Sequence, residues 1–203
     1  MSALLSRANG NVAGKHNLMV NLLNEKYLRG KLVLLLFVIT SCVYAFMLLV
    51  TIPHVMKFGN GMPLLDMMPL GYSYEYVTTL LESLGAGGRS AYLTKQIPAD
   101  MFYPGLFGIT YTLVFGYFLN KSGKLTTHWS VISYFPLLAS ACDYIENFFF
   151  IHMLANYPVI SEGTINIASV FSIAKSGTTT LYFVCLTVLV VYFIIKKVNR
   201  QRE

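Results

Sequence analysis

Residues 137–150 have the sequence LLASACDYIENFFF, and the interpretation of the whole chain depends on this stretch. It is apolar enough to cross a bilayer, yet it contains Asp143, Glu146 and Asn147 within five residues. Residues three and four apart lie on the same face of a helix, so these three polar side chains share one face. An Asp at the centre of a membrane helix costs about 2.5–3.5 kcal/mol on insertion scales. This face therefore needs partners, protons or water from other parts of the chain.

The composition of the chain is typical of a polytopic membrane protein. Of 203 residues, 55% are hydrophobic and only 12% are charged, and the mean hydropathy is +0.58. Such a chain is too apolar for a soluble domain. The net charge of +6 comes from basic residues that flank apolar runs instead of forming a patch. We therefore expect membrane lipids as partners and no nucleic acid.

Four apolar runs predict transmembrane helices, because each is about 20 residues long. The spans are expected at about residues 32–52, 101–119, 129–151 and 174–195. Residues 53–100 are expected to form a partly helical extracytoplasmic cap between the first and second spans. In this cap, Ser73 can cap a helix that begins at Tyr74 and ends at Gly85. The predicted fold class is an all-α integral membrane protein with a bundle of four transmembrane helices.

The distribution of Lys and Arg predicts the orientation of this bundle. Eleven basic residues fall on one side of the four-span arrangement, namely Arg7, Lys15, Lys26, Arg29, Lys31, Lys121, Lys124, Lys196, Lys197, Arg200 and Arg202. Because cytoplasmic loops are enriched in Lys and Arg, both termini are expected in the cytoplasm. The membrane domain would then cover residues 31–196, between an N-terminal segment (1–30) and a basic tail (197–203). Residues 16–29 fit either an amphipathic surface helix or a short solvated tether.

Ionisable and polar groups from separate segments are expected at a similar depth, in the outer half of the bundle. Helical rise places Asp143 and Glu146 in the outer part of the third span, near the outer ends of the second and fourth. The candidate catalytic residues are Asp143, Glu146 and Asp100. The candidate substrate-binding residues are Arg89, Tyr92, Asn147, Lys175 and Tyr103.

Two interpretations of this convergence remain open. In the first, Asp143 or Glu146 pairs with Lys175 and Asp100 pairs with Arg89, and these pairs only hold the helices in register. In the second, the carboxyls act as a general acid and base, because intramembrane ionisable residues commonly mark functional sites.

The chemical interpretation predicts an enzyme that acts on a lipid-like or isoprenoid-like substrate. Two alternatives are an accessory or assembly subunit that binds a partner's helices or a second copy of the chain, and a carrier of protons or a small solute.

No cofactor is expected from the sequence. It contains no G-x-S-x-G elbow, phosphate loop or dinucleotide fingerprint. A metal site is not predicted either, since the histidines lack ligand spacing. A carboxylate-only site for Mg²⁺ or Ca²⁺, formed by Asp100, Asp143 and Glu146, is a less favoured alternative.

Overall fold

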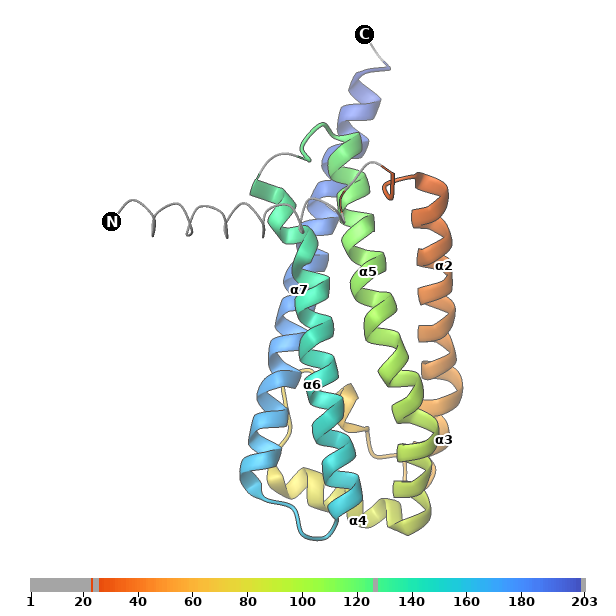
Figure 1. Ribbon diagram of the computed structural model, residues 1–203, viewed down its shortest axis with the longest axis vertical. Coiled ribbons are helices and arrows are strands. Elements are labelled where there is room, and N and C mark those ends of the chain that lie inside the picture. The colour runs from red at the N-terminus through yellow and green to blue at the C-terminus, as the bar shows by residue number, and fades with distance from the viewer. Residues whose placement is uncertain (1–22, 24–25, 126–127, 202–203) are drawn as a thin grey trace, which may run out of the picture.

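The computed structural model describes residue 23 and residues 26–125 and 128–201. Residues 1–22 lie outside this part, so most of the predicted amphipathic segment is not described. Within the described residues all regular structure is helical, without a strand. The four long helices run side by side along the long axis of the molecule (Figure 1). They are α2 (Gly30–Phe46), α5 (Ile97–Lys121), α6 (Phe135–Asn156) and α7 (Glu162–Asn199).

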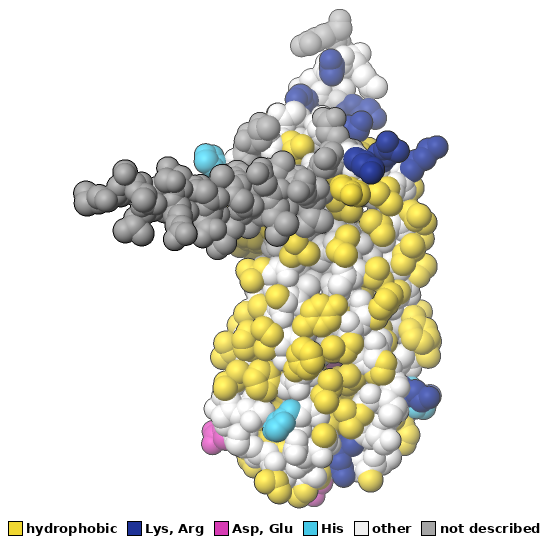
Figure 2. Space-filling view, in the orientation of Figure 1, with side chains coloured by type: hydrophobic (Ala, Val, Ile, Leu, Met, Phe, Trp, Pro, Cys, Tyr) yellow, Lys and Arg dark blue, Asp and Glu magenta, His cyan; other side chains and the backbone are white. Residues whose placement is uncertain are grey.

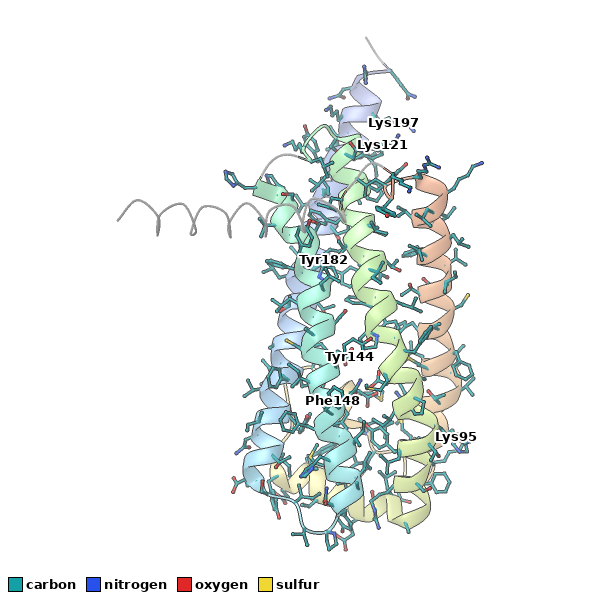
Figure 3. The ribbon with its side chains drawn as sticks, in the orientation of Figure 1. Lys95, Lys121, Tyr144, Phe148, Tyr182 and Lys197 are labelled. Carbon is teal, nitrogen blue, oxygen red and sulfur yellow. The ribbon has the colours of Figure 1, made fainter. Side chains whose placement is uncertain are left out.

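In the part of the chain that the structure describes, three helical stretches are long and apolar enough to cross a membrane: Gly30–Met56, Tyr74–Lys121 and Glu162–Asn199. Their outward faces carry large apolar side chains, among them Leu49 at 77% exposure and Val170 at 62%. The middle of the molecule shows a broad hydrophobic surface, with dark blue basic side chains concentrated at one end (Figure 2). Lys121 and Lys197 lie at this basic end, and Lys95 lies toward the other end (Figure 3). These faces are compatible with a multi-pass membrane protein.

The third predicted span begins later in the structure than the sequence indicated. Residues His128–Tyr134 form a 3₁₀ helix, η4, and α6 begins only at Phe135. Pro136 lies in the first turn of α6, where its fixed φ and missing N–H are tolerated. This proline explains why the apolar run from residue 129 does not form one continuous α-helix.

The segment after α2 continues through a π-helix, η1 (Met47–Thr51), into α3 (Ile52–Met56). Helix α4 (Tyr74–Ala91) then lies across the end of the bundle, and a second π-helix, η3 (Tyr92–Gln96), joins it to α5 (Figure 1). As predicted, Ser73 caps α4, since its Oγ accepts a hydrogen bond from the N–H of Tyr76 at 3.2 Å. The predicted end at Gly85 is instead a kink, with φ of 61°, after which the helix resumes.

The connection between α3 and α4 folds back into the bundle and contains the 3₁₀ helix η2 (Leu65–Met67). The N–H of Tyr72 donates to Ser169 Oγ at 2.9 Å, and Ser172 Oγ donates to the carbonyl of Met68 at 3.2 Å. At a rise of 1.5 Å per residue, Ser172 lies about 15 Å from the start of α7. The connection therefore packs against α7 several turns after the N-terminus of that helix.

Helix α5 is the central helix, since it packs against α2, α6 and α7. Thr40 of α2 and Thr110 of α5 share a buried hydrogen bond of 2.7 Å. On another face of α5, a Cβ at Gly108 would meet Ser140 Oγ of α6 at 2.6 Å. The absence of a side chain at Gly108 therefore allows α5 and α6 to approach closely.

Candidate functional site

A cavity of about 480 Å³ lies inside the bundle, between the fold-back connection and the long helices. Its walls come from α2 and η1, the connection, α5, α6 and α7. Its charged lining residues are Asp66, Asp100, Asp143 and Lys175. The remaining lining is apolar, aromatic or hydroxyl-bearing. We refer to this space as the chamber.

Lys175 of α7 pairs with two carboxylates of α6. Its Nζ donates to Asp143 Oδ1 at 3.0 Å and also forms an ion pair with Glu146. Glu146 is completely buried and does not line the chamber, whereas Asp143 does. Glu146 therefore lies behind the lysine and holds it in place, and Asp143 is the carboxylate of this pair that faces the cavity.

A proline on α5 explains the role of Asn147. Pro104 has no N–H, so the carbonyl of Asp100, four residues earlier, lacks its helical donor. The Nδ2 of Asn147 donates to this carbonyl oxygen at 3.0 Å. Asn147 thus replaces the missing helical hydrogen bond and fixes the backbone that carries Asp100. The Oδ2 of Asp100 is buried and has no hydrogen-bond partner among the described residues, although the side chain lines the chamber.

Asp66 of η2 is held by neutral donors. The hydroxyl of Tyr92 donates to Asp66 Oδ1 at 2.8 Å, and Gln96 Nε2 donates to Oδ2 at 3.0 Å. Gln96 in turn accepts a hydrogen bond from Thr51. Thr51 ends η1 and Gln96 ends η3, so the two π-helical segments meet at this network. Single π-helical turns are frequently found at functional sites.

Tyr72 approaches the lysine pair from the fold-back connection. Burial, together with the nearby charges of Glu146 and Asp66, raises the pKa of the Tyr72 phenol well above its usual range. Its hydroxyl is buried and has no hydrogen-bond partner among the described residues.

Aromatic side chains form the wall of the chamber between α2 and α5. Tyr44 of α2 stacks on Tyr103 of α5, with ring centroids 5.3 Å apart. Tyr103 also contacts Phe107 at 5.8 Å between centroids. A second cavity of about 250 Å³ shares Tyr44, Tyr103, Phe107 and Thr179 with the chamber. The two spaces together form a polar chamber with an aromatic extension along α5.

Most of the residues predicted for the site lie together, but Arg89 does not. Asp100, Asp143, Lys175 and Tyr103 line the chamber, and Tyr92 reaches it through Asp66. The guanidinium of Arg89 instead donates to the carbonyl of Leu81 at 2.7 Å and lies 4.3 Å from the Tyr157 ring centroid. The suggested ion pair between Arg89 and Asp100 is not formed. The kink at Gly85 turns Arg89 back onto its own helix.

Sequence reasoning missed three members of the site: Asp66, Gln96 and Thr51. Asp66 had a usable signal, because it is a lone carboxylate between Leu65 and Met67 in an apolar segment. A buried carboxylate needs donors, which points to a site. Gln96 and Thr51 carry no comparable signal, since isolated amides and hydroxyls are common at helix ends.

The described residues contain no group of three or more His, Cys, Asp or Glu placed to hold one metal ion. Comparison with protein-family models, curated proteins and solved structures gives no match for this chain.

Proposed function

We propose that α2, α5, α6 and α7 all cross the membrane, so that the chain is a four-span protein. Helix α6 has 22 residues, or about 33 Å at helical rise, which is enough to cross the hydrocarbon core. Its outward side chains include Leu138 at 54% and Phe148 at 61% exposure, whereas Asp143 and Glu146 face inward. Apolar side chains on the outside and carboxylates on the inside support α6 as a further membrane-spanning helix, whose charges are covered by the neighbouring helices.

We further propose that both termini lie in the cytoplasm and that α4 with the fold-back connection is the extracytoplasmic cap. The basic residues gather at the end where α2 begins and where α5 and α7 finish (Figure 2). This asymmetry supports the orientation through the positive-inside rule.

For the activity, we propose an intramembrane enzyme that uses acid–base chemistry on a lipid-like or isoprenoid-like substrate. The observation that carries this proposal is the chamber, in which Asp100 and Asp143 face one cavity from different helices. Asp143 is paired with Lys175, whereas Asp100 forms no ion pair within the described part of the chain. Two carboxyls with different surroundings are what a general acid and base require.

The chemistry assigned to this pair is proton transfer in which the number of protons on the enzyme does not change. One carboxylate accepts a proton from the substrate, and the other carboxyl group donates its proton to a second substrate atom. Glu146 acts as a positioning residue, because it is completely buried and pairs with Lys175, which in turn holds Asp143. Proton transfer by positioned side chains typically contributes about 10²–10⁴-fold to a rate.

The test uses the full chain purified in nanodiscs that contain lipid extract from the expression host. Retained and released lipids are analysed by mass spectrometry before and after incubation. Asp100→Asn and Asp143→Asn are compared with the wild type and with Glu82→Gln, which alters an exposed carboxylate on α4. We expect a lipid-like molecule to be converted by the wild type and Glu82→Gln but not by Asp100→Asn or Asp143→Asn.

Two results would overturn the proposal. Conversion by the folded Asp100→Asn and Asp143→Asn variants at the wild-type rate would exclude acid–base catalysis by these residues. Unchanged lipid retention with loss of a co-purifying membrane complex would favour the assembly-subunit alternative. Folding of each variant is checked by its thermal unfolding midpoint.

A further inference from the structure

The chamber has an unbalanced charge. Asp66, Asp100 and Asp143 line it, Glu146 lies directly behind it, and Lys175 is its one lining cation among the described residues. Even when one of Asp100 and Asp143 carries a proton, as the proposed acid–base pair requires, three carboxylates are left for one ammonium group. Buried carboxylates are usually paired or protonated, and a positive partner would offset this excess directly.

The existing donors do not remove this excess. Lys175 is already shared by Asp143 and Glu146. Asp66 receives hydrogen bonds from Tyr92 and Gln96, which are neutral. Asp100 is only 4% exposed, and its Oδ2 has no donor within the described part of the chain. A ligand with a hydrogen-bond donor and a positive charge would satisfy Asp100 and offset the excess together.

The aromatic extension, unlike the chamber, has no charged lining residue among those described. The lining of the second cavity consists of aromatic and hydroxyl side chains without a charge. Along α5 the combined space runs from Asp100 to Tyr111, which is about 16 Å at helical rise. The exposed lining residues of the chamber are Tyr44 of α2, Leu48 of η1, Met67 and Pro69 of the connection, and Thr180 of α7. The space therefore opens to the surface between α2 with η1, the connection and α7, which gives an apolar chain a route from the membrane.

We infer that the chamber binds the ammonium head group of a cationic amphiphile, and that the apolar chain of this ligand lies in the extension between α2 and α7. The head group donates to Asp100 and lies close to Asp66. This inference rests on the proposed lipid-like substrate and specifies its head group. An anionic head group is disfavoured, since the one lining lysine is already shared by two carboxylates.

The binding test uses the full chain in a nonionic detergent, with tritiated tetradecylamine as the probe. Tetradecanol and tetradecyl phosphate are matched competitors with the same chain. We expect saturable binding of the amine, with weak competition by the alcohol and the phosphate. A charge-assisted hydrogen bond lost in Asp100→Asn should weaken binding about tenfold to a hundredfold. Glu82→Gln should bind as the wild type does.

A second variant, Thr179→Leu, tests the binding of the ligand's apolar chain independently of its head-group charge. Thr179 lines both cavities, so a larger side chain should shorten the accessible extension. We expect this variant to prefer decylamine over hexadecylamine while the wild type shows the opposite preference. If the folded variant still prefers hexadecylamine over decylamine, the position assigned to the ligand's apolar chain is contradicted.

The outcome separates this inference from the proposed function. If the alcohol or the phosphate binds as tightly as the amine, or if folded Asp100→Asn retains full amine affinity, the cationic head group is refuted. Conversion of a neutral retained lipid in the nanodisc assay would then leave the enzyme proposal standing. Saturable amine binding without any lipid conversion would instead support the inference and count against catalysis.

Discussion

The hydrogen bond between Asn147 and the carbonyl of Asp100 gives the sharpest test of the structure. Its donor–acceptor distance is 3.0 Å, and Asn147 is completely buried. The bond exists because Pro104 cannot donate to that carbonyl. We therefore expect the free-energy cost of Asn147→Leu to depend on whether residue 104 is proline.

The magnitude follows from the environment of the bond. Leaving a buried acceptor without a donor costs about 1–3 kcal/mol, and hydrogen bonds between membrane helices average about 0.6 kcal/mol with a maximum near 1.7. In the Pro104→Ala background the new N–H of residue 104 can donate to the Asp100 carbonyl. We expect Asn147→Leu to cost about 1 kcal/mol more with Pro104 than with alanine.

The measurement is a double-mutant cycle on the unfolding free energy in bicelles. A cycle is needed because Asn147→Leu also removes the side-chain Oδ1, which lacks a partner in the described structure. That contribution is the same in both backgrounds and cancels. Thr110→Val is the control, since its hydrogen bond to Thr40 lies on another part of α5. Thr110→Val should be additive with Pro104→Ala, and equal costs of Asn147→Leu in both backgrounds would refute the reasoning.

Two further predictions concern the packing of the bundle. Gly108→Ala should lower the unfolding free energy by about 1–3 kcal/mol through overpacking against α6, whereas Gly177→Ala should be neutral or stabilising, because no atom lies within 4 Å of a Cβ there; thermal unfolding of both variants checks this difference. Lys175→Met should destabilise the protein by about 3–5 kcal/mol by leaving two buried carboxylates unpaired, and adding Asp143→Asn and Glu146→Gln should recover most of that loss. Failure of the triple variant to recover stability would show that Lys175 contributes through something other than its charge.

The sequence was sufficient to predict the meeting of α6 with α7. The three-residue spacing of Asp143 and Glu146 fixes their common face, and helical rise fixes their depth relative to Lys175. Both quantities are local and regular, so the ion pairs follow from counting residues. The proline at position 104 also carries usable information, because a proline inside a helix predicts that another group must satisfy the carbonyl four residues earlier.

The path of the connection between α3 and α4 could not be predicted in the same way. Its course depends on contacts between distant residues, such as the N–H of Tyr72 with Ser169, and on a φ of 84° at Gly71. Neither has a periodic signal. The connection brings Asp66 into the bundle, so the charge of the chamber was underestimated from the sequence. The predicted position of Arg89 was wrong for a related reason. The positive φ at Gly85 changes the direction of the part of α4 that carries Arg89.

The structure divides the polar face of α6 into side chains that are completely buried and one that lines the chamber. Glu146 and Asn147 are completely buried and are used to hold Lys175 and the backbone of Asp100. Asp143 and Asp100 are the carboxyls that these two residues position, and both line the chamber. The ion pair between Glu146 and Lys175 would be enough to fix the position of α6 against α7. Asp100 is buried with an Oδ2 that lacks a donor among the described residues, which costs stability unless a ligand or a proton offsets it, and this cost supports the function proposed for the chamber.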